Sequence, residues 1–284
     1  MKFGLMLPMA DDETAGFADL RAMAIAAEDD GLDSVWLADH LIFREGDETT
    51  GIHEAWTVLT AVAAITTRVQ IGPLVLALPF RNPALTAKMA STLQVLSGGR
   101  FMLGIGGGWR EDEYRSYGYE FPPASVRLHQ LEEVVQICRL MWTEPHPTFR
   151  GEYFAIDDAA ATPRPDVVPP ICIGAKGERI ALPVVGRCAD MWNTGFSSDE
   201  DWRRKRAIVD AAAEAAGRDP ASIASCATVA GDLPDSDTAS EQWRDRVQQL
   251  VDLGVAHIVL DFGHPLDPEP AVRFGEQVIA AFRS

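Results

Sequence analysis

The chain has 284 residues, and its composition narrows the classes of protein to which it can belong. Hydrophobic residues make up 47% of the sequence, which is enough for one large core, and α/β barrels of this length commonly form a single domain. Only 25 basic side chains face 42 acidic ones, for a formal net charge of −17. This charge argues against nucleic acid or an anionic membrane surface as a partner, because both would be repelled.

Targeting signals and membrane spans are not expected. The first residues, MKFGLMLPMADDE, turn acidic too early for a secretory leader, and no run of about 18 uncharged apolar residues occurs. Three of the four cysteines lie inside apolar runs and are predicted to be small buried hydrophobes of a reducing compartment; the four are Cys138, Cys172, Cys188 and Cys226. The sequence therefore predicts a cytoplasmic protein.

Short apolar runs alternate with longer amphipathic ones along the chain. The predicted strands, in order, span residues 2–7, 34–38, 69–75, 101–105, 170–174, 190–193, 223–230 and 256–260. The predicted helices that follow them span residues 14–30, 53–66, 83–96, 127–142, 178–186, 199–216, 239–253 and 269–282. Asn82 caps the third helix, and Pro83 suits its first turn. Strict alternation predicts a parallel sheet, and eight units favour an α/β (β/α)₈ barrel (TIM barrel) over an open sheet.

Residues 143–170 interrupt this rhythm. The stretch contains six prolines and has no helical period, so it is predicted to be an insertion with a tight hairpin at residues 149–154. Since no linker or repeat appears elsewhere, residues 1–284 are predicted to form one domain.

The second strand ends at Asp39 and His40. Barrel enzymes place their chemistry on the loops that follow the strands, and a carboxylate beside an imidazole suits proton transfer near neutral pH. The alternative is a histidine with a purely structural role.

The fourth strand runs into three consecutive glycines, Gly106, Gly107 and Gly108, followed by Trp109. Glycines at a strand end allow a cofactor ring or phosphate to approach the backbone, although a tight turn explains them equally well. The dinucleotide fingerprint is not matched, because Trp109 stands where its last glycine belongs.

The fifth strand is followed by Gly174, Ala175, Lys176, Gly177 and Glu178, which are predicted to open a helix. Free backbone amides, the helix dipole and the lysine favour an anion site, most simply for phosphate. The alternative is a short loop with a solvated lysine. Residues 110–113, which follow Trp109, are predicted to begin a helix with a solvated face. No residues of the sequence have the spacing of a metal site.

Together these segments resemble the luciferase-like oxidoreductase family over nearly the whole chain. The matching segments are residues 2–8 (KFGLMLP), 35–40 (VWLADH), 81–84 (RNPA), 96–101 (LSGGRF), 103–109 (LGIGGGW), 113–114 (EY), 149–154 (FRGEYF), 169–174 (PPICIG) and 189–193 (ADMWN). One branch of this family uses the deazaflavin coenzyme F420, and another uses FMN. The segments ending at His40 and spanning residues 174–178 look more like the F420 branch.

The resemblance implies roles for several residues. His40, and Asp39 with it, would face the reactive edge of the cofactor and the substrate. Leu74 and Val75 match the position where the family often has a non-proline cis peptide supporting the flavin-type ring. The glycines at 106–108 would lie near the cofactor, and residues 174–178 near its phosphate. Some F420-dependent sugar-phosphate dehydrogenases of the family carry a catalytic Glu where this chain has Trp109, so that reaction is not expected here.

The sequence therefore predicts a homodimeric enzyme that transfers hydride between F420 and a small organic substrate. One alternative is an FMN-dependent monooxygenase that uses reduced flavin and dioxygen. Another is a protein that binds the cofactor without turning it over. A metal-dependent hydrolase barrel is disfavoured because the sequence lacks paired metal ligands.

Overall fold

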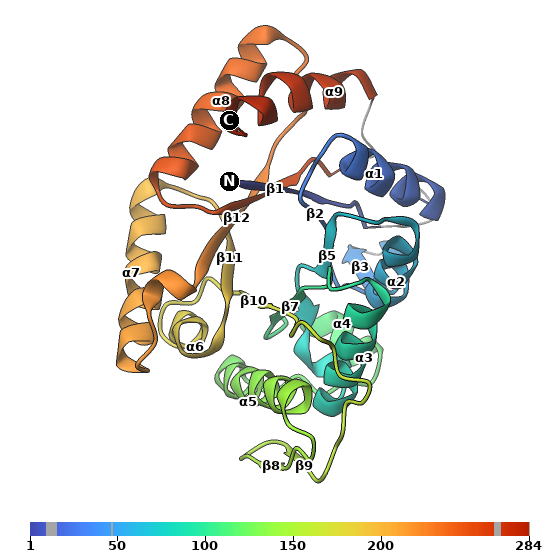
Figure 1. Cartoon of the computed structure of the whole chain (residues 1–284), viewed down its shortest axis with the longest axis vertical. Helices are drawn as coiled ribbons and strands as arrows, with labels where there is room; N and C mark the ends of the chain where they lie inside the picture. The colour runs from blue at the N-terminus through green and yellow to red at the C-terminus, as the bar shows by residue number, and fades with distance from the viewer. Residues whose placement is uncertain (10–15, 47, 264–267, 284) are drawn as a thin grey trace.

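A computed structural model describes residues 1–9, 16–46, 48–263 and 268–283 (Figure 1). Nine strand segments form one sheet in the order β5-β2-β1-β13-β12-β11-β10-β7-β6, and every pairing within it is parallel. Their bounds are β1 Lys2–Met6, β2 Ser34–Leu37, β5 Gln70–Pro73, β6 Leu76–Ala77, β7 Leu103–Gly106, β10 Ile171–Gly174, β11 Met191–Gly195, β12 Ala224–Ala230 and β13 His257–Asp261.

The sheet closes on itself, because its two ends are consecutive parts of one strand. β5 pairs with β2 and β6 pairs with β7, while only Leu74 and Val75 separate β5 from β6. A parallel bridge between Ile71 and Phe101 joins the β5 side to the β7 side. Counting β5 and β6 as one interrupted strand, the nine segments form the eight strands of the (β/α)₈ barrel that the sequence predicts.

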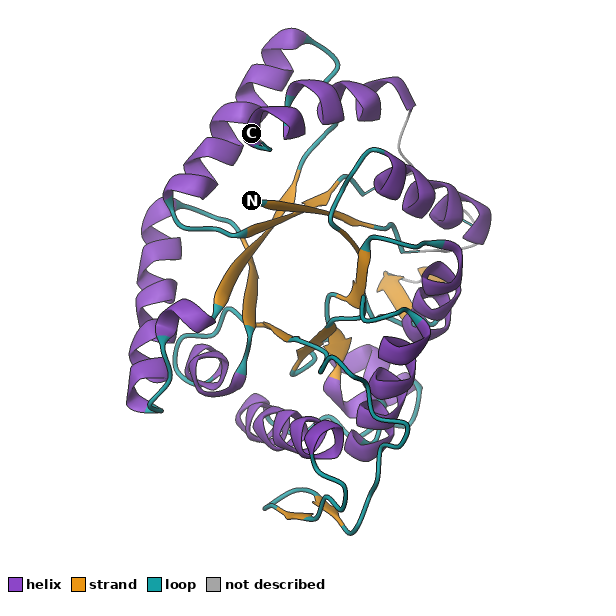
Figure 2. Cartoon of the chain, viewed as in Figure 1, coloured by secondary structure: helices purple, strands orange, loops and turns teal. Residues whose placement is uncertain are grey.

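The helices lie outside this ring of strands (Figure 2). Their bounds are α1 Phe17–Asp29, α2 Ala55–Ile65, α3 Pro83–Leu96, α4 Glu111–Ser116, α5 Ala124–Thr143, α6 Ala181–Cys188, α7 Asp199–Ala215, α8 Asp237–Asp252 and α9 Pro268–Gln277. As predicted, Asn82 caps α3: its side-chain oxygen accepts hydrogen bonds from the amides of Ala84 (2.9 Å) and Leu85 (3.2 Å). Of the predicted first helix, residues 14 and 15 lie outside the described residues.

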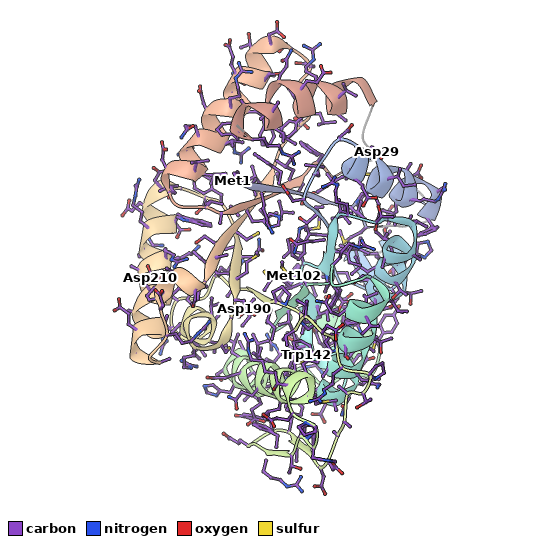
Figure 3. All side chains as sticks on the ribbon, viewed as in Figure 1. Met1, Asp29, Met102, Trp142, Asp190 and Asp210 are labelled. Atoms are coloured by element: carbon purple, nitrogen blue, oxygen red, sulfur yellow. The ribbon has the colours of Figure 1, made fainter. Side chains whose placement is uncertain are left out.

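Alternation along each strand divides the buried side chains into two cores. Phe3 and Leu5 of β1 face outward and pack with the helices in the main apolar cluster, whereas Met6 packs against an inner one. The inner cluster fills the barrel and comprises Trp36, Leu74, Met102, Cys172, Met191, Cys226 and Val259. Figure 3 shows Met102 within the ring of strands and Asp210 on the outer helical layer. The barrel interior is therefore a packed core and not a pore.

Two short hairpins decorate the barrel. Residues 144–170 connect α5 to β10 and include the antiparallel pair β8 (Phe149–Arg150) and β9 (Ala155–Ile156), which confirms the predicted insertion and its hairpin. The sequence predicts no element between residues 41 and 52, but β3 (Ile42–Glu45) and β4 (Glu48–Gly51) form a second antiparallel hairpin there.

The predicted start of the helix after β10 is wrong by three residues. Residues 178–180 form a turn, in which the amide of Leu182 donates to the carbonyl of Gly177 (3.0 Å), and α6 begins at Ala181. Pro183 explains the difference. A helix that began at Glu178 would place this proline beyond its first turn, where the missing amide breaks a hydrogen bond.

Candidate functional site

The predicted site residues meet at one end of the barrel, because all strands run parallel and their carboxyl ends share a rim. Val75 lies beside two neighbouring strand ends, those of β7 and β10. A Cβ atom built on Gly106 would lie 2.7 Å from Cγ2 of Val75, and one built on Gly174 would lie 2.9 Å from its Cγ1. The Val75 side chain therefore fills the space that these two glycines leave open.

The peptide bond between Leu74 and Val75 is cis, as the resemblance predicts. It lies between β5 and β6, so the third strand of the barrel is interrupted where Val75 enters the mouth.

The three-glycine loop packs against side chains of the protein itself. A Cβ atom on Gly107 would lie 3.3 Å from Leu128, and one on Gly108, whose φ is +70°, would lie 1.9 Å from the hydroxyl of Tyr114. Arg127 holds the loop by donating from Nε to the carbonyl of Gly107 (2.9 Å) and from a terminal nitrogen to that of Gly108 (3.3 Å). Close packing thus accounts for these glycines, and their contact with a cofactor stays a prediction.

His40 is held by a buried carboxylate. Its Nδ1 atom lies 3.1 Å from Oε2 of Glu113, whose side chain is only 1% exposed. Glu113 Oε1 also accepts the backbone amides of Leu41 and Ile42. Burial opposes ionisation of Glu113, but the hydrogen bonds from His40 and the two amides lower its pKa below the ordinary value. Glu113 is therefore a carboxylate that fixes the orientation of His40.

Glu113 corrects the prediction of a solvated face for residues 110–113. Helix α4 does begin at Glu111, yet its third residue points inward while Glu111 stays exposed. A six-residue helix offers too little periodicity to reveal which acidic side chain is buried. The one signal in the sequence is that the Glu113-Tyr114 pair is among the segments matching the family. The resemblance assigns no role to either residue.

Asp39, which precedes His40 after the second strand, is bound by Ala77 and Arg81. Its carboxylate is 2% exposed and accepts from the amide of Ala77 (2.9 Å) and from two nitrogens of Arg81 (2.7 and 3.0 Å). Arg81 also pairs with Glu54, the N-cap of α2. Burial of Arg81 opposes its charge, but the contacts to Asp39 hold its pKa above the ordinary value. Asp39 therefore does not contact His40, and Glu113 is the group that can set the His40 tautomer.

Three rings line the mouth beside the glycine loop: His40, Phe43 and Trp109, here called the aromatic rim. The His40 ring centroid lies 4.7 Å from that of Phe43 and 5.8 Å from that of Trp109. The guanidinium of Arg110 lies 4.5 Å from the centroid of Phe43 and 5.4 Å from that of Trp109, and it pairs with Asp112 (3.3 Å).

The loop after β10 offers backbone donors. Within the described part of the chain, no acceptor is found for the amides of residues 176–180, and the side chain of Lys176 is exposed. Ala175 is bound on both sides, because its amide donates to Asn193 and its carbonyl accepts from Trp192. The carboxylate of Glu178 accepts from Arg204 (3.0 Å). The loop is thus held in place at Ala175 and has free amides after it, an arrangement that suits an anion.

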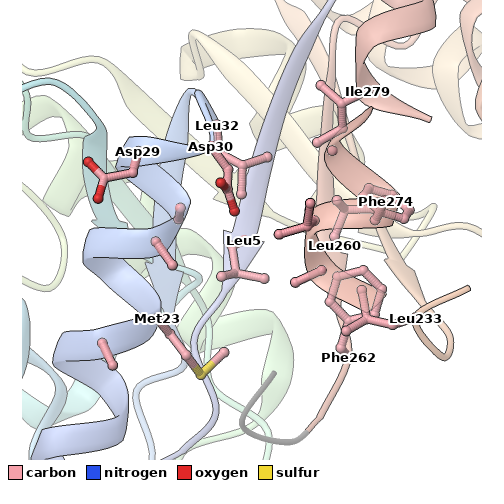
Figure 4. A pocket seen from close by; sticks show the side chains of 16 residues that line it. Leu5, Met23, Asp29, Asp30, Leu32, Leu233, Leu260, Phe262, Phe274 and Ile279 are labelled. Atoms are coloured by element: carbon pink, nitrogen blue, oxygen red, sulfur yellow. The ribbon is translucent and has the colours of Figure 1, made fainter. Parts of the chain in front are cut away.

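A separate apolar cavity of about 370 Å³ lies between α1 and α9 (Figure 4). Leu5 and Leu260 contribute to its wall from the outer face of the barrel, and Met23 and Phe274 contribute from the helices. The cavity therefore lies on the outer side of the barrel wall. Among the described residues, no helix is long and apolar enough to cross a membrane, and no three potential metal ligands cluster.

Comparison with known proteins places this geometry in a family. The sequence pattern of the luciferase-like monooxygenases matches residues 1–268. The chain belongs to this family. It is 38% identical over 190 residues to an F420-dependent glucose-6-phosphate dehydrogenase of Amycolatopsis mediterranei (strain U-32), covering 66% of this chain and 55% of that protein. It is 31% identical over 207 residues to the pyrimidine monooxygenase RutA of Allorhizobium ampelinum (strain ATCC BAA-846 / DSM 112012 / S4), covering 70% and 56%.

The luciferase-like chain thus spans just over half the length of these two relatives. Its fold is similar to that of an F420-dependent secondary alcohol dehydrogenase solved with an F420-acetone adduct, with a TM-score of 0.84, 22% identity and coverage of 98% of both chains. At this identity the likeness establishes the shared barrel alone.

Proposed function

We propose that this protein is an F420-dependent oxidoreductase that transfers hydride between the deazaflavin coenzyme and a small organic substrate at the barrel mouth. The observation that carries the proposal is the pairing of His40 with the buried carboxylate of Glu113 at the end of the second strand. Similarity to relatives named as F420-dependent dehydrogenases supports the choice of coenzyme.

The residues present fit such a coenzyme. Val75, half-buried among Gly106 and Gly174, offers an apolar floor for a ring, with Leu74 behind it. The free amides of residues 176–180 and the ammonium of Lys176 offer donors for a phosphate. When bound, F420 supplies the two-electron acceptor or donor for the hydride.

The remaining chemistry is the placing of one proton, and we assign it to His40. Glu113 occupies Nδ1, while Nε2 has no partner among the described residues, so the second nitrogen is available to a substrate oxygen. A histidine held in this way can accept or donate the proton that accompanies hydride transfer. We give Asp39 an anchoring role, because Arg81 and the amide of Ala77 already occupy its oxygens.

Calorimetric titration with F420 and with FMN tests the proposal. We expect tighter binding of F420, followed by a change in its absorbance when a substrate is turned over. Clear preference for FMN would instead favour a flavin monooxygenase, the activity named for one relative. Bound coenzyme that no reductant, oxidant or substrate ever changes would favour the cofactor-binding alternative.

We also propose that the protein is a cytoplasmic homodimer. Helix α3 carries three large apolar side chains that are 46–68% exposed, Leu85, Val95 and Leu96. We take these exposed apolar side chains as the candidate contact between two copies of the chain. We expect sedimentation analysis to give twice the 30.9 kDa chain mass, and Leu96→Glu to shift the protein toward the monomer. A monomer of the unmodified chain would contradict the proposal.

A further inference from the structure

Trp109 differs from every other tryptophan of the chain in its exposure. Its side chain is 69% exposed, whereas the remaining six are at most 7% exposed: Trp36, Trp56, Trp142, Trp192, Trp202 and Trp243. Its position also differs, because it directly follows the three-glycine loop and makes a T-shaped contact with the His40 ring at an interplanar angle of 83°. An open indole face thus lies beside the histidine to which we assign the proton.

The aromatic rim holds this indole in place. Arg110 lies over the rings of both Phe43 and Trp109, and Asp112 in turn pairs with Arg110. Phe43 comes from β3, so the β3–β4 hairpin supports the rim from the side. A ring supported in this way loses little conformational freedom when a flat group stacks on it.

The charges around the rim disfavour an anionic substrate. Arg81 is paired with Asp39 and Glu54, and Arg110 is paired with Asp112. Arg127 is directed at the backbone carbonyls of the glycine loop. Glu113 adds a negative charge directly behind His40, so none of these three arginines offers a free cation to a substrate phosphate. Arg44, which follows Phe43, directs its guanidinium to the hydroxyl of Ser116 at the end of α4 (2.7 Å).

We propose that Trp109 is the substrate platform and that the substrate is an uncharged molecule with an aromatic or conjugated group next to its reacting alcohol or carbonyl carbon. The flat group stacks on the indole while the oxygen reaches His40. This inference rests on the proposed function for the reaction, but the recognition step stands on the exposed indole. It sets the chain apart from its relatives named for glucose 6-phosphate.

A binding measurement without coenzyme tests the platform. Acrylamide quenching of tryptophan fluorescence reports mainly on Trp109, because the other six indoles are buried. We expect 1-phenylethanol to protect this signal, and 2-propanol and glucose 6-phosphate to leave it unchanged. Trp109→Phe should lack the quenchable signal, which verifies its origin. Equal protection by glucose 6-phosphate, or a signal already shielded in a concentration-dependent way by a second copy, would overturn the inference.

Turnover with F420 provides the second measurement. We expect Trp109→Ala to raise KM for 1-phenylethanol at least about tenfold, as loss of an aromatic contact allows, and to change KM for 2-propanol less than about threefold. Trp109→Phe should retain most of the affinity. Tyr117→Ala is the matched control, since Tyr117 is an exposed aromatic residue at the end of α4 outside the rim.

The two measurements separate failure of the inference from failure of the proposed function. If F420 does not bind but 1-phenylethanol still protects Trp109, the coenzyme assignment is wrong and the platform is supported. If F420 is turned over but Trp109→Ala raises KM equally for both alcohols, the platform is wrong and the oxidoreductase assignment is supported.

Discussion

The Nδ1 atom of His40 lies 3.1 Å from Oε2 of Glu113, a carboxylate that is almost fully buried and also caps the backbone amides that follow His40. This one side chain therefore fixes both the imidazole and the start of the segment that leads to Phe43 of the aromatic rim. The relationship joins the segment after β2 to helix α4, which follows β7 and is far from β2 in the sequence.

Glu113→Gln should lower kcat about 10- to 100-fold with little change in coenzyme affinity. The amide keeps the shape of the side chain, but it removes the charge that stabilises a protonated His40 during proton transfer. Steady-state kinetics and coenzyme titration on the same variant check this. Glu111→Gln, on the exposed face of α4, is the control and should behave as the unmodified protein. A variant with normal kcat and raised KM would assign Glu113 to binding instead.

His40→Ala should abolish most turnover while leaving the coenzyme Kd nearly intact. General acid–base assistance typically contributes about 10²–10⁴-fold in rate, whereas the imidazole makes few of the contacts of a large coenzyme. Single-turnover rates and calorimetry on the same preparation separate the two effects. A rate loss below tenfold would mean that His40 only packs within the aromatic rim.

Lys176→Ala should raise the coenzyme Kd by about 5- to 20-fold and change kcat less than about threefold. A charge-assisted bond to phosphate is the same in the ground and transition states, so its loss is a loss of uniform binding. The free amides of residues 177–180 should limit the effect. Calorimetry checks this, with Arg203→Ala on the exposed side of α7 as the control. An unchanged Kd would remove Lys176 from the site.

The sequence predicts the barrel well because the relevant signals are local and repeated. Each strand is a short apolar run, and helices α2, α3, α7 and α8 begin at a residue whose side chain caps them, as Asn82 does for α3. The cis peptide at Leu74–Val75 is also predicted, although only through resemblance, since neither residue type by itself signals a cis bond.

What the sequence does not predict depends on contacts between distant segments. The partner of His40 is 73 residues away, and that of Asp39 is 42 residues away. Because Asp39 and His40 are adjacent in the sequence, a direct contact between them is the simplest expectation. Successive residues of an extended segment point in opposite directions, however, and the carboxylate of Asp39 binds Arg81 instead. The late start of α6 is different, because Pro183 already signals it in the sequence.

The last prediction concerns stability and begins at the opposite end of the barrel, where His257 opens β13. Its Nε2 atom lies 2.8 Å from Oγ of Ser34, which accepts the indole N–H of Trp36 (2.7 Å) and so has its own hydrogen to donate. Burial, and then the charge of Lys2, lower the pKa of His257 from 6.5 to about 4. The folded protein therefore keeps this imidazole neutral.

The sign of the pH effect follows from proton uptake. Between pH 6.5 and about 4 the unfolded chain binds a proton at His257 and the folded chain does not, so the free energy of unfolding falls as the pH falls through this window. The slope from one such group is about 1.4 kcal/mol per pH unit. His257→Gln should lower stability at pH 7.5 and remove most of that slope, as measured by urea unfolding at pH 4.5, 5.5, 6.5 and 7.5. His129→Gln, which removes an exposed histidine of α5, should leave the slope in place. An undiminished slope in His257→Gln would show that other groups control acid unfolding.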